Sequence, residues 1–253
     1  MSWSPLQLVA LGALGLLAGA VNAAAGGGSL LTFPALVAFG LPALTANLSN
    51  AVAQCPGYVS ISYGYRPELG GQRPRIVRLL PAALVGGVTG VALLELGSPA
   101  TFKAVAPALV IVACLLLAAP ARLRSGLARR AGHRHRAAGL HLAVGVTCAY
   151  AAYFGAGGGV LLLAVLSTFV VDDLQRLNAL NRLLIMIVNL LAAVLFIILG
   201  PLNWPAIAVL GPTTLVGGRG GVALVRRLDA ETLRAVVLFI GVISAVYLAV
   251  TSW

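Results

Sequence analysis

Long apolar stretches, each about as long as a membrane-spanning helix, follow one another along most of this chain. A helix needs about 20 apolar residues to cross the hydrocarbon core of a bilayer. Charged residues make up 9% of the 253 residues, whereas a soluble domain has about a quarter. So few charges cannot cover a water-facing surface, and we expect an all-α integral membrane protein. The expected spans are Pro5–Ala25, Ala43–Tyr63, Val77–Leu96, Thr101–Ala119, Gly139–Phe154, Ala179–Leu199, Trp204–Val225 and Thr232–Trp253, with shorter apolar pieces at Ser29–Phe39 and Val160–Val171.

The net charge of +11 comes from basic residues that are gathered in loops. They cluster in Arg66–Arg78 and Arg122–Arg136. Basic loops of membrane proteins lie on the cytoplasmic side, so topology explains this charge and we expect the lipid bilayer, not a nucleic acid, as the partner. The three cysteines show no metal-ligand spacing, and the chain has no nucleotide-binding loop or hydrolase triad. We therefore expect no metal, no cofactor and no enzymatic activity.

The second half of the chain repeats the first at a shift of 131 residues. The run Ala25–Gly28 coincides with Ala156–Gly159. Without a gap, the same shift pairs Asn47 with Asn178, Asn50 with Asn181, Pro81 with Pro212 and Thr101 with Thr232. Since chance does not hold one register over so long a stretch, we expect two homologous helical-bundle repeats, residues 5–122 and 136–253, joined by a basic cytoplasmic linker at 123–135.

Loop charges indicate that the two repeats cross the membrane in opposite senses. The basic loop 66–78 corresponds to the uncharged loop 200–204. The loop 95–100, which has no basic residue, corresponds to a loop that carries Arg226 and Arg227. Inverted topology requires an odd number of crossings per repeat. A hairpin broken at the glycines and three further spanning helices give that parity, and the alternative is eight spans arranged as two parallel four-helix repeats.

Polar residues inside the expected spans mark candidate binding positions, because such groups are costly in a bilayer. Asn47 and Asn50 lie three residues apart, hence on one helix face, and Gln54 extends that face by a turn. Asn178 and Asn181 repeat the pair. Carboxamides offer donors and an acceptor without charge, which suits an oxyanion that must bind and then leave. The alternative is that these side chains only hold neighbouring helices together.

The consecutive glycines predict a helix break that forms part of the same site. Glycine costs about 1 kcal/mol relative to alanine inside a helix. A helix that restarts at Ser29 or at Val160 exposes backbone N–H groups and the positive end of its dipole, and helix starts of this kind bind anions. Broken helices at the membrane midplane form the binding sites of many transporters. Other glycines, such as Gly86 and Gly217, are interpreted as helix-packing positions.

The charged residues within or near the spans separate the candidate mechanisms. Arg219, in the segment "LVGGRGGVAL", either extends toward the cytoplasmic interface or attracts anions there. The acidic residues Glu95, Asp172 and Asp173 lie near span ends, so a carboxylate proton relay or a sodium site has no carrier. An anion exporter needs neither, because an inside-negative potential favours outward anion movement by about 2.3 kcal/mol per charge per 100 mV.

Four segments together resemble the sulfite exporter TauE/SafE family, in the toluene sulfonate uptake permease superfamily. They are "VNAAAGGGSLLTFPAL", "TANLSNAVAQCPGYVSISYGYRPELGGQ", "AYFGAGGGVLLLAVL" and "DDLQRLNAL", and the resemblance covers essentially the whole chain. It implies a multi-pass permease of the bacterial inner membrane for sulfite, sulfoacetate or similar sulfur-containing anions, generally an exporter. It implies site roles for both glycine runs and for Asn47, Asn50, Asn178 and Gln54. Relatives often carry a lysine at the position of Asn181, and Arg182 is expected to supply that charge here.

The expected substrate-binding residues are Gly26, Gly27, Gly28, Ser29, Asn47, Asn50, Gln54, Gly157, Gly158, Gly159, Asn178, Asn181 and Arg182. The favoured function is a secondary transporter for a small sulfur-containing oxyanion, acting in the export direction. The alternatives are an anion-selective channel and a membrane assembly factor without transport activity. A homo-oligomer is compatible with the sequence.

Overall fold

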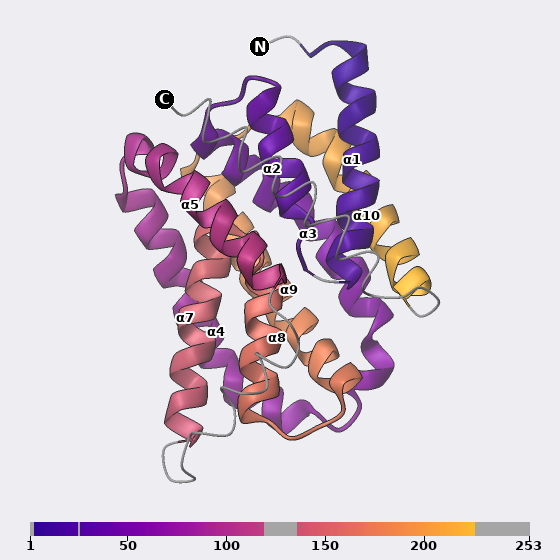
Figure 1. The fold of residues 1–253 in the computed structure, drawn as a ribbon, viewed down its shortest axis with the longest axis vertical. Coiled ribbons are helices and arrows are strands. Elements are labelled where there is room, and N and C mark those ends of the chain that lie inside the picture. The colour runs from indigo at the N-terminus through magenta and orange to yellow at the C-terminus, as the bar shows by residue number, and fades with distance from the viewer. Residues whose placement is uncertain (1–2, 25, 119–135, 226–253) are drawn as a thin grey trace.

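The computed structural model describes residues 3–24, 26–118 and 136–225, and every regular element in these ranges is a helix (Figure 1). The predicted linker at 123–135 and the last expected span, Thr232–Trp253, lie outside the described residues. The helices are α1 (Pro5–Ala24), α2 (Ser29–Ala38), α3 (Ala43–Gly64), the 3₁₀ turn η1 (Arg66–Leu69), α4 (Arg73–Leu96), α5 (Pro99–Ala118), α7 (Arg136–Phe154), α8 (Gly158–Phe169), α9 (Leu174–Leu199) and α10 (Trp204–Val225).

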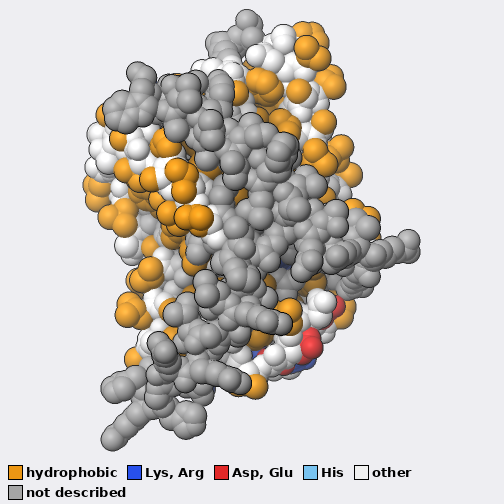
Figure 2. Space-filling model, in the orientation of Figure 1, with side chains coloured by type: hydrophobic (Ala, Val, Ile, Leu, Met, Phe, Trp, Pro, Cys, Tyr) orange, Lys and Arg blue, Asp and Glu red, His pale blue; other side chains and the backbone are white. Residues whose placement is uncertain are grey.

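Five of the described helices are long and apolar enough to cross a membrane: α1, α4, α7, α9 and α10. The 22-residue helix α3 was also an expected span, but its buried asparagines and Gln54 give it a lower hydropathy. Side chains such as Leu6 and Leu96 are 79% and 87% exposed, and Figure 2 shows hydrophobic side chains over much of the described surface. An apolar exterior of this kind is what a bilayer covers. The chain is therefore a multi-pass membrane protein.

Each glycine run ends a long helix and precedes a short one, as predicted. After α1 comes the 10-residue α2, and after α7 comes the 12-residue α8. At 1.5 Å per residue these short helices are about 15 and 18 Å long, well under the bilayer core. The prediction that the second short helix begins at Val160 is wrong by two residues. Gly155 and Gly157 make the turn with φ angles of 80° and 76°, which leaves Gly158 free to begin α8.

Two pairs of helices pack so closely that their backbones touch. Helix α1 packs along α10, and α4 packs along α7. A Cβ atom on Gly217 would clash with the backbone carbonyl of Leu16, and one on Gly86 would clash with that of Gly145. The prediction that these glycines serve helix packing is confirmed. In Figure 1, α1 descends from the upper end of the view while α7 rises from the lower end.

A cluster of phenylalanine rings holds the short helix α2 against its neighbours. The Phe33 ring of α2 lies 5.4 Å from that of Phe154, at the end of α7, and 6.4 Å from that of Phe102 in α5. All three side chains are at most 2% exposed. Such edge-to-face pairs contribute about 0.5–1.5 kcal/mol each beyond their burial. The hairpin formed by α1 and α2 is therefore anchored to the end of α7.

The close contact of α10 with α1 predicts opposite outcomes for two glycines in the same helix. Gly217→Val places a branched side chain against the backbone of Leu16, and we expect a loss of about 1–3 kcal/mol of stability. Gly220→Val should change stability by less than about 0.5 kcal/mol, because no atom lies within 4 Å of its Cβ position. Thermal unfolding of the purified variants in detergent measures both. Equal midpoints for the two variants would contradict the packing assignment.

Candidate functional site

The two glycine turns meet in the interior of the bundle. A Cβ atom on Gly26 would lie 3.3 Å from the Cα atom of Gly159, and one on Gly159 would lie 3.5 Å from that of Gly26. Gly26 and Gly157 both have a φ angle of 76°, in the left-handed region that glycine adopts without strain. The N-termini of α2 and α8 therefore begin beside each other, and backbone rather than side chains forms the contact.

The side chain of Arg182 lies against this contact. Arg182 lies in the first third of α9 and is 3% exposed. Its Nη1 atom lies 3.0 Å from the Cβ position of Gly26 and 3.4 Å from that of Gly159. An arginine stays protonated in proteins, and a helix N-terminus carries the positive end of the helix dipole. A fixed positive charge and two positive helix ends thus converge, which favours a negatively charged ligand.

Three asparagines near the glycine turns have buried polar atoms without a hydrogen-bond partner among the described residues. Asn47 donates from Nδ2 to the backbone oxygen of Tyr153, 3.0 Å away, but its Oδ1 is unpaired. Asn178 Oδ1 is also unpaired, as are both polar atoms of the fully buried Asn181. Leaving such atoms unpaired costs about 1–3 kcal/mol each, so these side chains are candidates for ligand contact.

Two other predicted site residues instead hydrogen-bond to protein neighbours. Thr32 donates from Oγ1 to Asn50 Oδ1 at 2.6 Å, and Gln54 donates from Nε2 to Thr32 Oγ1 at 3.0 Å. These bonds tie α2 to α3. For Asn50 and Gln54, these contacts agree with the alternative that such side chains hold neighbouring helices together. The asparagine pair on α9 and Asn47 remain the better candidates for substrate.

Asn22 is a buried polar residue of this region that the sequence analysis did not single out. Its Oδ1 accepts the Gly28 N–H at 2.8 Å, and its Nδ2 donates to Gln54 Oε1 at 3.1 Å. Asn22 therefore occupies one N–H group at the start of α2. At the position 131 residues later stands Tyr153, so α8 has no equivalent cap. The only signal in the sequence is one asparagine in an apolar run, directly before the glycines.

The glycines within each run have different roles. A Cβ on Gly28 would clash with the carbonyl oxygen of Ala18, and one on Gly158 would lie 2.5 Å from the Cβ of Ala151. These two positions let each short helix fold back on the long helix before it. Gly27 accepts the Leu30 N–H at 3.0 Å in the first turn of α2. Gly28 and Gly158 thus allow the short helices to approach the long ones, whereas Gly26 and Gly159 form the contact between the two hairpins.

Ser29 and Tyr58 complete the polar surroundings of the first turn. Ser29 is 3% exposed, and its Oγ lies 3.8 Å from the Cβ position of Gly155, in the other glycine turn. The Tyr58 hydroxyl lies close enough to Ser29 and Asn22, and to the Arg182 guanidinium, to interact electrostatically with all three. Ser29 was predicted as a site residue. Tyr58 was not, because an aromatic residue in an apolar helix carries no distinguishing pattern.

Comparison with known proteins agrees with these features of the chain. The family model described as "Sulfite exporter TauE/SafE" matches residues 11–248, which is nearly the whole chain. The chain belongs to the sulfite exporter TauE/SafE family.

Curated relatives cover the same length. The "Probable membrane transporter protein YfcA" of Escherichia coli K12 is 26% identical over 95% of this chain and 88% of its own length. A "Probable membrane transporter protein" of Haemophilus influenzae is 24% identical over 91% of this chain and 90% of its own. No solved structure matches the chain significantly. The comparisons therefore establish a TauE/SafE membrane transporter and leave its substrate open.

Arg219 lies apart from the glycine turns of this TauE/SafE protein. It is exposed on α10 and lines a cavity together with Arg66 and Tyr63, at the end of α3. Arg182, by contrast, is buried between the two hairpins. The positive charge next to the predicted anion site is therefore that of Arg182.

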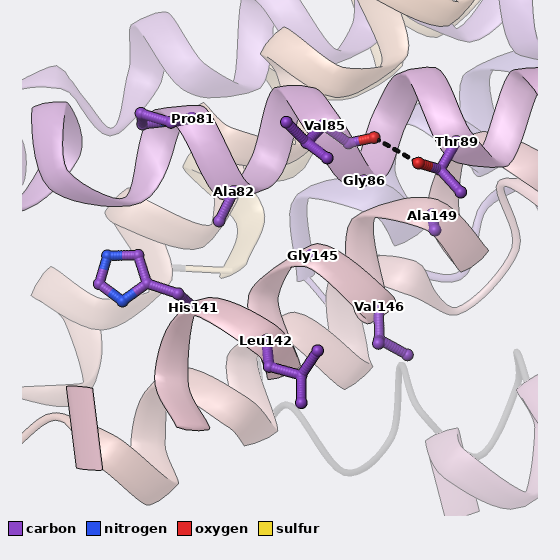
Figure 3. Close-up of a pocket in the computed structure, with 10 residues that line it drawn as sticks. All are labelled: Pro81, Ala82, Val85, Gly86, Thr89, His141, Leu142, Gly145, Val146 and Ala149. Carbon is purple, nitrogen blue, oxygen red and sulfur yellow. Dashed lines mark hydrogen bonds between the residues drawn. The ribbon is translucent and has the colours of Figure 1, made fainter. Parts of the chain in front are cut away.

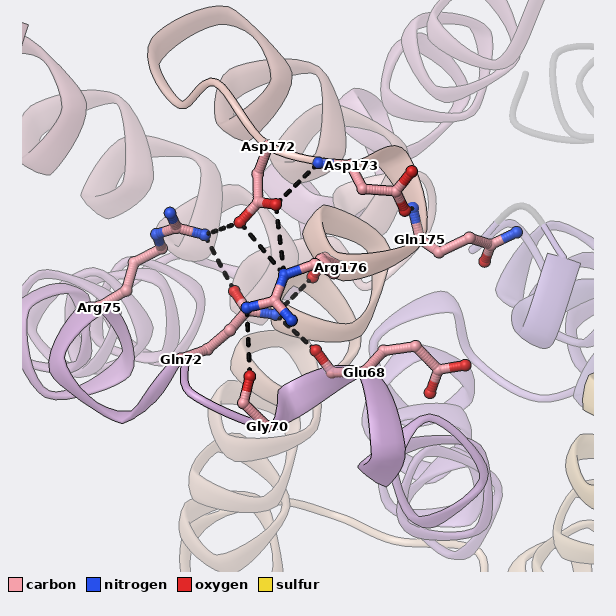
Figure 4. A network of polar contacts seen from close by, with 8 residues as sticks. All are labelled: Glu68, Gly70, Gln72, Arg75, Asp172, Asp173, Gln175 and Arg176. Carbon is pink, nitrogen blue, oxygen red and sulfur yellow. Dashed lines mark hydrogen bonds and ion pairs between the residues drawn. The ribbon is translucent and has the colours of Figure 1, made fainter.

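A network of polar contacts closes the end of the bundle that carries the basic loop (Figure 4). Arg75 of α4 forms an ion pair of 2.6 Å with Asp172, and Arg176 of α9 forms one of 3.2 Å with the same carboxylate. The Arg75 guanidinium holds the pKa of the Asp172 carboxyl below its ordinary value. Gln72, only 2% exposed, donates to the backbone oxygen of Arg176 at 2.9 Å. These contacts join α4 to α9 across the two halves of the chain.

A cavity of about 450 Å³ between α4 and α7 lies outside the candidate site. Figure 3 shows Pro81 and His141 at one end of it and Thr89 and Ala149 at the other. Most of its lining is apolar, and the Thr89 hydroxyl donates within its own helix to the oxygen of Val85 at 2.8 Å. Since no arginine or lysine is among its described lining residues, this cavity is a poor anion site.

The double hydrogen bonding of Asn22 predicts a specific loss of stability. Asn22→Ala leaves the Gly28 N–H and the Gln54 Oε1 unpaired in the interior, and we expect a loss of about 1–3 kcal/mol. Gln7→Ala is the matched control, because the Gln7 side chain accepts from the Ser4 N–H at the exposed end of the same helix. Thermal unfolding of both variants measures the difference. An Asn22→Ala variant as stable as wild type would show that the hydrogen bond from Gly28 to Asn22 does not stabilise the turn.

Proposed function

We propose that this TauE/SafE transporter binds a small sulfur-containing oxyanion or organosulfonate at the contact between its two glycine turns. The observation that carries the proposal is the buried Arg182 guanidinium, placed against Gly26 and Gly159 at the start of two helices. An arginine fork matches the oxygen geometry of a planar or pyramidal oxyanion. Backbone at the helix starts adds N–H groups that point at the same ligand.

The asparagines supply the remaining polar lining in this proposal. Asn178, Asn181 and Arg182 lie within about one turn of α9, and Asn47 reaches the same region from α3 through its bond to Tyr153. Carboxamide nitrogens donate to anion oxygens, and carboxamide oxygens accept from a protonated oxygen or a water. Neutral partners keep affinity modest, because a transporter site must also release its cargo.

The proposal includes two repeats of inverted topology, residues 5–122 and 136–253. The exchange of partners between repeats supports it, since the first helix of each repeat packs along a helix of the other repeat, α1 along α10 and α7 along α4, and α4 and α10 begin 131 residues apart. The opposite directions of α1 and α7 and the shared φ angle of Gly26 and Gly157 support it further. Transporters built in this way bind substrate where the repeats meet.

Alternating access is the mechanism that the contacts at the two ends of the bundle support. At the basic end, Gln72 and the ion pairs of Asp172 tie α4 to α9. At the other end, Asn203 accepts from Trp3 Nε1 at 3.2 Å and donates its backbone N–H to Ser49 Oγ at 2.8 Å. Gln72 and Asn203 are themselves 131 residues apart and directly precede α4 and α10. Breaking the contacts at one end while keeping those at the other would open the binding site to one side of the membrane at a time.

The proposed direction is export across the bacterial inner membrane. The membrane potential drives an anion outward without any coupled ion. The acidic residues Asp172 and Asp173 lie in the loop before α9 rather than beside Arg182, in keeping with transport that uses no carboxylate relay.

Removing the Arg182 charge is the direct test of the site. Arg182→Gln should reduce sulfite or sulfonate flux into proteoliposomes by about 10- to 100-fold, because a charge-assisted hydrogen bond is lost. Arg182→Lys should retain part of the flux, since the charge stays but the fork geometry is lost. Arg73→Gln is the matched control on the exposed part of the basic loop. Size-exclusion profiles establish that the variants are folded.

The same assay separates the proposal from its alternatives. Flux of sulfite, sulfate, sulfoacetate, thiosulfate and chloride is compared under an imposed potential. Saturable flux that depends on the anion supports a transporter, whereas unsaturated flux with weak selectivity indicates a channel and no flux of any anion indicates an assembly factor. Normal flux in Arg182→Gln, or in Asn47→Ala combined with Asn178→Ala, would falsify the site assignment.

Cysteine labelling tests the inverted topology. In a background without Cys55, Cys114 and Cys148, single cysteines at Ser98 and Trp204 should react with an impermeant reagent from the periplasm. A cysteine at Gln175 should react only after the cytoplasmic side is opened. Ser98, Trp204 and Gln175 are exposed, so labelling reports the side rather than burial. If the cysteines that replace Trp204 and Gln175 react from the same side of the membrane, the result supports the parallel arrangement instead.

A further inference from the structure

A second basic site lies on the outside of the bundle, away from the glycine turns. A cavity of about 570 Å³ is lined by the end of α3, by η1 and by the second half of α10. Arg66 and Arg219 both line it, and none of its lining residues is acidic. Two guanidinium groups that face one hollow repel each other, so the cavity is suited to a negatively charged group between them.

The geometry of Arg66 prepares it for such a ligand. Its guanidinium carbon lies 4.2 Å from the centroid of the Tyr63 ring, in a cation–π contact. Stacking on a ring face orients the guanidinium and leaves the N–H groups along its edge able to donate. Arg219 approaches from α10, at a point where Gly220 beside it has no atom within 4 Å of its Cβ position.

Most of the remaining lining is apolar, and much of it faces outward. Val59, Tyr63 and Leu215 are 44%, 60% and 41% exposed. They lie on α3 and α10, on the lateral surface of a protein that a bilayer surrounds. A ligand in this position therefore contacts the two arginines with its charged end. The rest of the ligand contacts apolar side chains and the surrounding lipid. A small inorganic anion has no part that uses the apolar walls.

We propose that this cavity binds the phosphate headgroup of an anionic membrane lipid between Arg66 and Arg219, with the acyl chains along the apolar walls. The basic loop that contains Arg66 assigns this end to the cytoplasmic leaflet, where arginines are attracted to anionic headgroups. The site is independent of the transport proposal, because Arg182 is buried between the hairpins and these arginines are exposed.

Lipid retention by the full-length protein tests this site. The protein is placed in nanodiscs of phosphatidylcholine with a minor share of phosphatidylglycerol, and the lipids kept after transfer to detergent are identified by native mass spectrometry. Wild type should retain phosphatidylglycerol in preference to phosphatidylcholine. Arg66→Gln combined with Arg219→Gln should lower that retention by about an order of magnitude. Arg73→Gln, which removes an exposed charge at the start of α4 and outside the cavity, should leave it unchanged.

Two further arms make each outcome decisive. Arg66→Lys combined with Arg219→Lys keeps both charges and should retain most of the phosphatidylglycerol, which separates loss of charge from loss of fold. Soluble glycerol phosphate and inorganic phosphate should not displace the lipid. Equal retention by the double glutamine variant and wild type, an equal loss in Arg73→Gln, or displacement by soluble phosphate overturns the proposal, the last in favour of a soluble phosphate site.

Discussion

The contact between two bare stretches of backbone is the constraint on which the centre of this transporter depends. Gly26 lies so close to Gly159 and Arg182 that a Cβ atom on Gly26 would press against both, at 3.3 Å from the Cα atom of Gly159 and 3.0 Å from Arg182 Nη1. The absence of side chains here lets two helix starts and one guanidinium lie within contact distance of one another. Such a concentration of positive charge inside an apolar bundle favours an anion more than any one of the three parts would alone.

Glycine serves two distinct purposes in this fold, and both depend on the missing Cβ. Along α4 and α10, single glycines such as Gly86 and Gly217 let whole helices touch backbone to backbone. In the turns, Gly26 and Gly157 adopt positive φ angles that end one helix before the next begins. The glycines within α4 and α10 let helices from the two halves of the chain pack along their length. The glycines in the turns expose polar backbone groups in the interior of the bundle.

Much of the fold was predictable because its signals are local. Three consecutive glycines inside an apolar run predict a helix break, and the short helices at Ser29–Ala38 and Gly158–Phe169 follow the two runs, whereas the pair Gly86 and Gly87 stays within α4. The start of α8 was misplaced by two residues because Gly155, outside the run, makes part of the turn. Because Gly155 takes part in the turn, α8 can begin at Gly158, and the run of three glycines alone does not predict this start.

The candidate site was predictable only in outline, because satisfaction of hydrogen bonds is a property of three dimensions. Asn50 and Asn47 share a helix face, yet Asn50 accepts a bond from Thr32 while Asn47 keeps an unpaired oxygen among the described residues. Asn22 was missed because its two partners, Gly28 after the turn and Gln54 of α3, come within reach only in the folded chain. Arg219 looked the more unusual arginine in the sequence, but depth within the bundle distinguishes Arg182.

The bond from Asn47 to the carbonyl of Tyr153 has a consequence for how related proteins diverge. It attaches α3 to the end of α7 through backbone, so the residue at position 153 is free to vary without loss of the link. The glycine contact likewise uses main-chain atoms only. We therefore expect the frame of the pocket to be inherited unchanged while a few side chains on α9 diversify, which allows one architecture to acquire new cargo by single substitutions.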